Sequence, residues 1–450
     1  MTERTAKDPV HLGYLVPEFP GQTHGFFWRE IGVLTQLRIQ PDIVSTRHPR
    51  KDSANQEWSG QAERLTTYLV PSSLPELVSL VRELRTPGPS RMAEIIRAAY
   101  EMSGQRSSPF PRPRHIRALA RQLAWLALGA ALSGLARERG WQHIHVHSCG
   151  NAANIALYAH LLSGLPYSLT LHGPLGDYGP NQVHKWANAA FSIVITDELN
   201  GQVRRALGAA LPRHIAVAPM GVDAEEFRRA TPYSPWSGQE TFRLFSCGRL
   251  NPSKGHDVLL AAVATMHRDG ADVELTIAGE DESGGAGYHR ELERLIERHG
   301  LHRHVRLLGA VPASRIRQEL DRSHAFALAS HAEPLGVAIM EAMCMGVPVV
   351  ATAAGGVPEL VVDGTGLLVS PGNPEELASA LMRLMTDPQL SEALGDAGRE
   401  RATAAFGHRR SAEVLAQLVR SEMASRADES DFGAGVGHAP HSDPVFRAAG

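Results

Sequence analysis

Short apolar segments alternate with amphipathic stretches along most of this 450-residue sequence. Such an alternation predicts parallel α/β sheets, because two parallel strands must be joined by a crossover and a helix usually provides it. In the first half, a helical stretch around Phe26–Leu37 follows the first predicted strand. The strands predicted there are His11–Val16, Asp42–Ser45, Thr67–Val70, Ile144–His147, Tyr167–Leu171, Ser192–Thr196 and His214–Ala218.

The alternation breaks once, at Thr231–Glu240, which is rich in Pro, Ser and Gly, as a linker is. We therefore predict an α/β protein of two Rossmann-like domains, residues 1–230 and 241–424, with a ligand cleft between them. The last helical stretch, Pro374 to about Met423, is expected to cross back to the first domain. Residues 425–450 are polar and aperiodic, which predicts a disordered tail. The strands predicted after the linker are Phe242–Cys247, Val273–Ala278, Val305–Leu308, Ala325–Ala329 and Val347–Ala351.

Composition narrows the class of protein. The formal net charge of −3 is close to neutral for this length, so it gives no argument for nucleic acid as a partner. The three cysteines, Cys149, Cys247 and Cys344, match neither a zinc site nor a disulfide framework, which favours a reducing compartment. The N-terminal Met1–Pro9 is polar, unlike a signal peptide, and the longest apolar run, Leu123–Leu132, is shorter than the roughly 20 residues that span a bilayer. We therefore expect a cytoplasmic protein.

The segment Ser330–Val350 follows a predicted strand and becomes helical at about Pro334. The amides of Leu335 and Gly336 would then lie at a helix start, where unpaired N–H groups and the helix dipole attract anions. Gly336 has no side chain, so a phosphate could approach the backbone closely. This segment is a candidate phosphate site.

Two carboxylates lie in the same segment, Glu333 in the loop and Glu341 on the helix. Apolar residues flank Glu341, and a buried carboxylate needs hydrogen-bond donors such as the hydroxyls of a ribose. An amphipathic helix with one Glu facing solvent explains the same spacing about as well.

A second segment, Ser246–Leu260, places Arg249 and Lys254 in a loop between a strand and a helix. Two cations at such a junction suit a diphosphate, because Arg can bind two of its oxygens at once. Taken alone, the segment is equally consistent with a solvated basic loop. Two further candidates follow N-terminal strands: His172, which on its own is more often structural, and Gly21, which could approach a phosphate.

The pattern of Glu333, seven residues, Glu341 and then Gly346-Val-Pro-Val-Val resembles the signature of retaining glycosyltransferases with the GT-B fold, family 4 or group 1. The resemblance implies that Glu341 holds the donor ribose and that Glu333 contacts the transferred sugar. It also implies that the amides of Leu335 and Gly336 meet the donor phosphates.

The resemblance extends to the other segments. It implies that Arg249 and Lys254 bind the donor pyrophosphate and that His172 hydrogen-bonds a hydroxyl of the donor sugar. Many family members carry two glycines in the first loop, whereas this chain has Pro20-Gly21. That loop resembles a subset involved in exopolysaccharide and colanic-acid-type assembly, and Thr23, His24 and Arg29 are expected to face the acceptor. The segments Pro219–Asp223 and Ala354–Glu359 resemble family turns at the interdomain crossing and after the signature.

The implied activity is transfer of a hexosyl unit from a UDP- or GDP-sugar to a hydroxyl of a glycan, glycolipid or polyprenyl-linked acceptor in polysaccharide biosynthesis. We expect no cofactor beyond the donor and no metal, because no Asp-x-Asp pair follows a predicted strand. Two alternatives stay open: a sugar-nucleotide epimerase of the same fold, and a non-catalytic protein that binds sugar nucleotides.

One further stretch concerns a possible membrane partner. Arg82–Arg139 holds eleven Arg and four Glu among Leu-rich segments. A basic amphipathic region of this kind can lie against an anionic leaflet. A solvated helical pair whose apolar face packs on the domain explains the composition as well.

Overall fold

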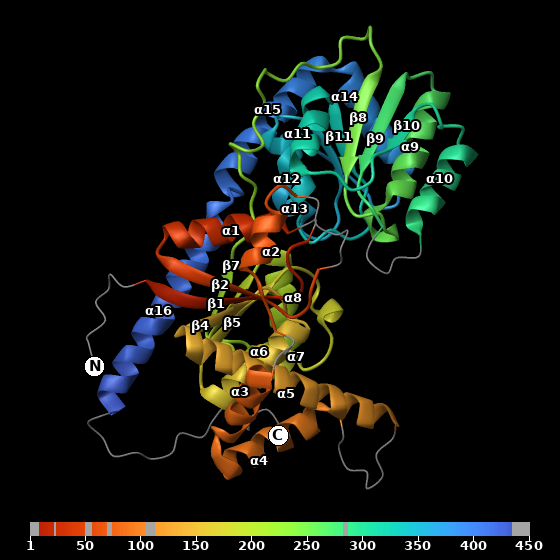
Figure 1. Ribbon diagram of the computed structural model, residues 1–450. Coiled ribbons are helices and arrows are strands. Elements are labelled where there is room, and N and C mark those ends of the chain that lie inside the picture. Colours follow the sequence, from red (N-terminus) through yellow and green to blue (C-terminus); the bar gives the residue numbers. More distant parts are fainter. Residues whose placement is uncertain are drawn as a thin grey trace.

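The computed structural model describes residues 9–21, 24–49, 56–69, 74–104, 113–281 and 287–433. They form two α/β domains, each built on its own parallel sheet (Figure 1). The central strands of each sheet are buried on both faces, which is typical of parallel sheets covered by helices. The predicted fold class is confirmed.

The N-terminal sheet has seven strands, and its order places β1 and β4 at the centre. The chain leaves β1 toward one edge and returns at β4 to build toward the other edge, so these two strands mark the switch point. All seven strands of the prediction occur within a few residues of their expected bounds. In spatial order they are β3 (Thr67–Tyr68), β2 (Ile39–Ser45), β1 (Val10–Val16), β4 (His143–Val146), β5 (Tyr167–Leu171), β6 (Phe191–Val194) and β7 (His214–Val217).

The C-terminal sheet has six strands, with its switch point between β8 and β11. The sequence predicted five of them and missed the short edge strand β13, which is only partly buried. In spatial order they are β10 (Val305–Leu307), β9 (Val273–Ala278), β8 (Phe242–Cys247), β11 (Ala325–Leu328), β12 (Val349–Thr352) and β13 (Leu367–Val369).

Helices cover both sheets. Those of the N-terminal domain are α1 (Gly25–Gln36), α2 (Ser59–Leu65), α3 (Leu74–Arg85), α4 (Gly88–Met102), α5 (Pro113–Arg139), α6 (Asn151–Ser163), α7 (Gln182–Ala187) and α8 (Asp197–Leu207). The C-terminal helices are α9 (His256–Arg268), α10 (Tyr288–Arg298), α11 (Ala313–Arg322), α12 (Val337–Cys344), α13 (Val357–Leu360), α14 (Pro374–Thr386), α15 (Pro388–Ala405) and α16 (Arg409–Gly433).

The last helical stretch crosses back to the N-terminal domain, as predicted, but as three helices. Helix α16 lies beside α1 (Figure 1), and Arg409 at its start donates to Oε1 of Gln36 at 2.8 Å. The prediction of a disordered tail from residue 425 is wrong for residues 425–433, which continue α16. Residues 425–432 contain neither Gly nor Pro, so nothing stops the helix before Gly433.

The chain passes between the two domains twice, and these two segments lie side by side. The amide of Val222 donates to the carbonyl of Phe406 at 3.0 Å, and the amide of His408 donates back to the Val222 carbonyl at 3.1 Å. A Cβ on Gly221 would lie 2.3 Å from the Phe406 carbonyl oxygen, so only glycine allows the two chains to approach so closely. The segment Pro219–Asp223 therefore lies at the interdomain crossing, as expected.

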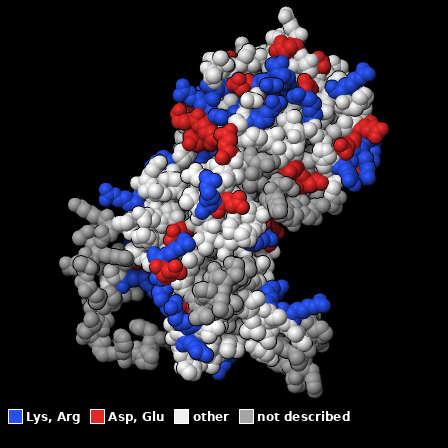
Figure 2. Space-filling view, in the orientation of Figure 1, with Lys and Arg blue, Asp and Glu red and all other residues white. Residues whose placement is uncertain are grey.

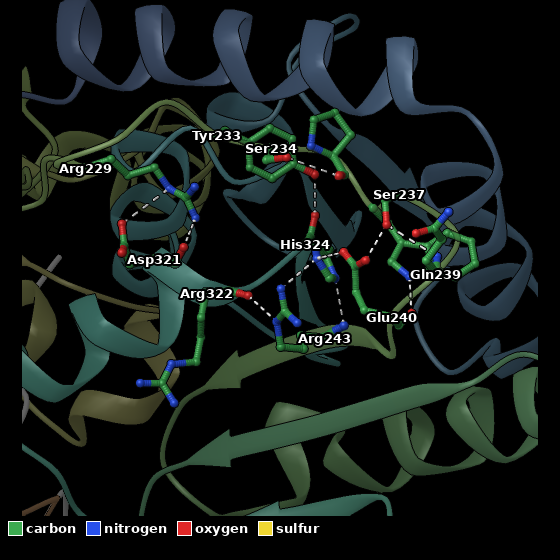
Figure 3. Close-up of polar contacts among 12 residues, drawn as sticks. Arg229, Tyr233, Ser234, Ser237, Gln239, Glu240, Arg243, Asp321, Arg322 and His324 are labelled. Carbon is green, nitrogen blue, oxygen red and sulfur yellow. Dashed lines mark hydrogen bonds and ion pairs between the residues drawn. The ribbon is translucent and has the colours of Figure 1, made fainter.

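The predicted linker is tied to the domain that follows it (Figure 3). Tyr233 donates its hydroxyl to the His324 carbonyl at 2.7 Å, and Arg229 donates to the Leu320 carbonyl at 2.8 Å. Glu240 lies 3.3 Å from Nε2 of His324. The segment therefore packs on the C-terminal domain through specific polar contacts.

Helices α3, α4 and α5 form the end of the molecule farthest from the C-terminal domain (Figure 1). Within the described residues, one stretch of α5, His115–Arg139, is long and apolar enough to cross a membrane, with 44% of its most apolar window buried. Helix α5 packs on α6, and a buried helix of a folded domain passes the same test.

Candidate active site

The predicted site residues follow the strands that flank the two switch points. Gly21 follows β1 and His172 follows β5, the neighbour of β4. In the other sheet, Arg249 and Lys254 follow β8 and Glu333 follows β11. Ligands of open α/β sheets bind outside the carboxyl ends of strands at such points.

Lys254 and Glu333 form an ion pair at this edge of the C-terminal sheet. The ammonium nitrogen lies 2.5 Å from Oε2 of Glu333, and the two side chains are 13% and 8% exposed. The Ser330 hydroxyl donates to the same oxygen at 3.2 Å. An ammonium has three N–H donors, so two can still reach a ligand while one is held by the carboxylate. The sequence predicted both residues at the site but did not predict that they pair.

A glycine holds the two loops of this pair together. Gly255 has a φ of +62°, and a Cβ there would lie 1.9 Å from the carbonyl oxygen of Ala329. Beside it, the amide of His331 donates to the Ser253 carbonyl at 2.8 Å. The loop after β8 therefore packs directly on the end of β11, which keeps Lys254 close to Glu333.

The helix of the signature segment begins at Val337, three residues later than predicted. Gly336 precedes it with a φ of +100°, a conformation that L side chains rarely adopt, so the chain turns before the helix starts. Leu335 is buried in that turn. The amides of the first turn of α12 have no partner within the helix and can bind an anion there.

Glu341 lies about one turn into α12 and is partly buried. Burial raises the pKa of its carboxyl to about 7, and the positive charge of Arg29 opposes that rise. Arg29 itself lies 3.1 Å from Oε2 of Glu226. Arg29 is therefore paired with Glu226 within electrostatic reach of Glu341, and its predicted role toward the acceptor stays a prediction. The side chain of Glu341 makes no hydrogen bond or ion pair with any residue that the structure describes, so its carboxylate can receive a ligand.

The charge of Arg249 acts on residues of the N-terminal domain. Burial, and after it the charge of Arg249, lowers the pKa of His24 to about 4. The His24 ring stacks on Phe19 and covers Gly21, where a Cβ would lie 2.6 Å from Nδ1 of His24. The charge of Arg249 also counteracts the burial that raises the pKa of Tyr178. Arg249 is thus within electrostatic reach of both N-terminal loops, while Gln22 and Thr23 lie outside the described residues.

The two domains touch at the edges that carry these residues. A Cβ on Gly173 would lie 3.6 Å from Cγ of Pro334, in the signature loop of the other domain. The Glu359 carboxylate accepts hydrogen bonds at 2.8 Å from the amides of Asp197 and Glu198, at the start of α8. His172 is therefore next to the loop that carries Glu333. The predicted residues of both domains come together at one interface.

The turn after the signature serves backbone geometry, as expected. The amide of Gly356 donates to the Glu333 carbonyl at 3.0 Å, and a Cβ on Gly355 would lie 2.3 Å from that oxygen. The two glycines therefore let this turn support the backbone of Glu333.

Sequence reasoning missed the partners of His172. Its Nε2 lies 3.1 Å from Nδ1 of His147, and Nε2 of His147 lies 2.8 Å from Oε2 of Glu30. Burial, and after it the neighbouring His147, lowers the pKa of His172 to about 3, and the charge of Glu30 opposes this effect. The signal was present in the alternation of His143, His145 and His147, which puts three imidazoles on one face of a strand.

Two parallel α/β sheets whose carboxyl edges meet at a domain interface are the arrangement of the GT-B fold. The comparisons with known proteins agree with this class. Residues 235–401 match the family Glycosyl transferases group 1. Over 310 residues the chain is 28% identical to alpha-D-kanosaminyltransferase of Streptomyces kanamyceticus, covering 64% of this chain and 78% of that protein.

A second relative is the GDP-mannose-dependent monoacylated alpha-(1-6)-phosphatidylinositol monomannoside mannosyltransferase of Corynebacterium glutamicum. It is 30% identical over 218 residues, which cover 45% of this chain and 55% of the relative, so this match spans about half of that protein. Among solved structures, Anabaena HepE in complex with UDP is similar in fold, with a TM-score of 0.65 at 20% identity over 92% of this chain and all of that one. These findings support the group 1 glycosyltransferase family with the GT-B fold, and hence a transferase enzyme.

Proposed function

We propose that this protein is a retaining glycosyltransferase that moves a hexosyl unit from a UDP- or GDP-sugar to a hydroxyl of a glycan, glycolipid or polyprenyl-linked acceptor. One observation carries the proposal. Arg249, Lys254 and the start of α12 lie together at the carboxyl ends of β8 and β11, and His172 of the other domain lies beside them. Two cations and a helix start suit a diphosphate, and the facing His suits a sugar.

The donor is assigned to these residues by its chemistry. Its diphosphate would be bound by Arg249, by the remaining N–H donors of Lys254 and by the backbone at Leu335 and Gly336. Its ribose hydroxyls would donate to Glu341, the carboxylate without a partner among the described residues. The transferred sugar would then lie toward Glu333 and the N-terminal domain, where His172 faces it.

In the reaction we propose, the bond between the anomeric carbon and the diphosphate oxygen breaks while the acceptor oxygen attacks from the same face. The acceptor proton passes to the departing diphosphate. Glu333 is held by Lys254 and Ser330, which suits a role in charge stabilisation and not in nucleophilic attack. Arg249, Lys254 and the α12 dipole would neutralise the diphosphate, the role that a metal plays elsewhere, and we propose that no metal is required.

The nucleotide base of the proposed donor is uracil or guanine. The Corynebacterium relative is named as GDP-mannose-dependent, and HepE was solved with UDP, so a UDP- or GDP-sugar is the proposed donor. The test is a panel of UDP- and GDP-sugars screened by thermal shift with wild type and Arg249→Ala. We expect one sugar nucleotide to raise the melting temperature of wild type and to bind Arg249→Ala at least tenfold more weakly, since a charge-assisted contact contributes about 1.5–3 kcal/mol. Equal binding to both proteins would refute the diphosphate assignment.

The acceptor is proposed to be presented at an anionic membrane surface. Large apolar side chains are exposed on three neighbouring helices: Val81, Ile96, Tyr100, Ile116 and Leu123. Arg97, Arg117 and Arg121 of the same helices are exposed too, and blue side chains stand out from a largely white surface at this end of the molecule (Figure 2). Apolar contact together with Arg suits anionic lipid headgroups.

Vesicle co-sedimentation tests this surface. We expect binding to phosphatidylglycerol vesicles that weakens with salt and that exceeds binding to phosphatidylcholine. The double variant Ile116→Ser/Leu123→Ser should lose binding, whereas Leu368→Ser, an exposed apolar residue of the other domain, should not. No binding by wild type would remove the membrane from the proposal and leave the donor site untouched.

The alternatives give different products. An epimerase would convert the donor sugar without an acceptor, and a non-catalytic protein would bind the donor without releasing nucleotide. Measuring nucleotide release and sugar identity with and without acceptor separates all three.

A further inference from the structure

A chain of buried polar groups leads from the core of the N-terminal domain to His172. Glu30 on α1, His147 at the end of β4 and Tyr14 on β1 are 2%, 3% and 0% exposed. Oε2 of Glu30 accepts the Tyr14 hydroxyl at 2.7 Å and lies 2.8 Å from Nε2 of His147. Nδ1 of His147 then lies 3.1 Å from Nε2 of His172. The proposed function uses only the last member of this chain.

The carboxylate of Glu30 is the end of the chain whose role as hydrogen-bond acceptor is fixed. Burial alone would raise the pKa of Glu30, but the contact with His147 lowers it, as do Ser411 of α16 and Tyr14. An ionised carboxylate can only accept hydrogen bonds, so Nε2 of His147 must carry the hydrogen that faces it. A neutral His147 therefore presents Nδ1 as an acceptor to His172.

Which histidine donates in the His147–His172 contact follows from the donor in the Glu30–His147 contact. If Nδ1 of His147 accepts, Nε2 of His172 must donate, so the hydrogen of a neutral His172 is on Nε2. Nδ1 of His172 is then an acceptor, and it makes no hydrogen bond with the residues that the structure describes. The chain thus leaves one lone pair of His172 for a hydroxyl donor.

The two histidines deeper on the same strand show that burial alone does not require such a chain. His143 and His145 are bonded by Ser168 and Thr170 of the neighbouring strand at 2.7–2.9 Å. His147 instead lies at the strand end, between a carboxylate and the site histidine. A histidine with a purely structural role at position 147 could hydrogen-bond a neighbouring hydroxyl, as His143 and His145 do.

We propose that Glu30 and His147 are positioning residues that fix the ring orientation and tautomer of His172, so that its Nδ1 accepts a hydrogen bond from a hydroxyl of the transferred sugar. The second half of this statement rests on the proposed function, whereas the tautomer itself does not. The replacement Glu30→Gln can present an amide N–H to His147, which would reverse every donor in the chain. Glu30→Asp keeps a carboxylate and should keep the direction.

The test is nitrogen NMR of histidine-labelled full-length protein, with His172→Asn used to assign the His172 signals. In wild type we expect a hydrogen on Nε2 and none on Nδ1, in Glu30→Asp the same, and in Glu30→Gln the opposite tautomer or a mixture. Tyr14→Phe, which removes a different donor from the same carboxylate, should leave the tautomer unchanged. The opposite tautomer in wild type overturns the proposal even if Glu30→Gln does not fold, and an unchanged tautomer in a folded Glu30→Gln overturns it as well.

Kinetics then separate positioning from structural support. We expect Glu30→Gln to lower kcat about tenfold or more while the donor KM changes less than about threefold, with activity recovered in part by Glu30→Asp. The donor should shift the Nδ1 signal of His172 when it binds wild type. A correct tautomer with no shift would contradict the sugar contact and leave the positioning chain standing. Loss of activity in Tyr14→Phe equal to that in Glu30→Gln would indicate core damage and overturn the positioning role.

Discussion

The ammonium of Lys254 lies 2.5 Å from a carboxylate oxygen of Glu333, so the proposed phosphate-binding cation and the proposed sugar-contacting carboxylate form one buried pair. Breaking a buried pair by removing one partner leaves an uncompensated charge, which is more costly than losing both. The site therefore couples donor binding to local stability.

For this pair, Lys254→Ala should lower the unfolding free energy by about 3 kcal/mol and weaken donor binding at least tenfold. The double variant Lys254→Ala/Glu333→Gln should recover stability but not donor affinity, because the charge on Glu333 is gone and the cation is still missing. Arg294→Ala, which breaks the exposed pair with Glu291, should change stability by less than about 1 kcal/mol. Urea unfolding and calorimetry measure both quantities. Wild-type donor affinity in the single variant would contradict the assignment of Lys254.

The pKa of about 7 at Glu341 gives donor binding a pH dependence. Ribose hydroxyls donate more strongly to an ionised carboxylate than to a neutral carboxyl, and burial keeps this carboxyl protonated below about pH 7. Donor affinity should therefore fall as the pH drops through 7, by up to about tenfold per unit, and level off above pH 8. Binding titrations between pH 5.5 and 8.5 measure this, and Glu341→Gln should give a weaker and flat profile. A wild-type profile without a step near 7 would rule out Glu341 as the titrating ribose acceptor.

Glu359 joins the domains by accepting the amides of Asp197 and Glu198 at the start of α8. Removal of a helix cap costs about 0.5–2 kcal/mol, so Glu359→Ala should lower the unfolding free energy by about 1 kcal/mol. Glu375→Ala replaces an exposed Glu that, like Glu359, lies in the first turn of a helix, and is the matched control, expected near wild type. Thermal and urea unfolding of both variants check this. Equal stabilities would show that the interdomain contact does not hold in solution.

Activity should persist in excess EDTA. Arg249, Lys254 and the start of α12 supply the positive charge that the departing diphosphate needs. Within the described ranges, no group of three His, Cys, Asp or Glu side chains is placed to hold a metal. Turnover assays with EDTA, and then with added magnesium or manganese, measure the requirement. Loss of activity that either metal restores would show that our account of leaving-group stabilisation is wrong.

The sequence predicted the two sheets well because buried parallel strands are continuous apolar runs between loops. It failed at ends. Strand β13 has only three residues, and the start of α12 moved from Pro334 to Val337 because Gly336 adopts a φ of +100°. Residues 425–433 are polar enough to suggest a tail, yet they continue a helix whose earlier turns pack on α1.

The sequence predicted which residues belong to the site but not which residues contact each other. Motif spacing indicated Lys254, Glu333 and His172, since each follows a strand and carries a suitable group. The contacts Lys254–Glu333 and His147–Glu30 join residues that are 79 and more than 100 positions apart. Only the strand order and the loop packing bring such residues together, and neither can be read from local periodicity.

The central claim is that this interface transfers a sugar from a nucleotide donor, and steady-state nucleotide release tests it most directly. With the donor found in the thermal-shift panel, we expect acceptor to accelerate release by wild type. Glu333→Gln should mainly lower kcat, because its contact matters most as the glycosidic bond breaks, and Glu341→Gln should mainly raise the donor KM. Glu375→Gln is the control and should match wild type, with circular dichroism confirming that all variants fold. No nucleotide release from any UDP- or GDP-sugar, or wild-type kinetics in both carboxylate variants, would contradict the account.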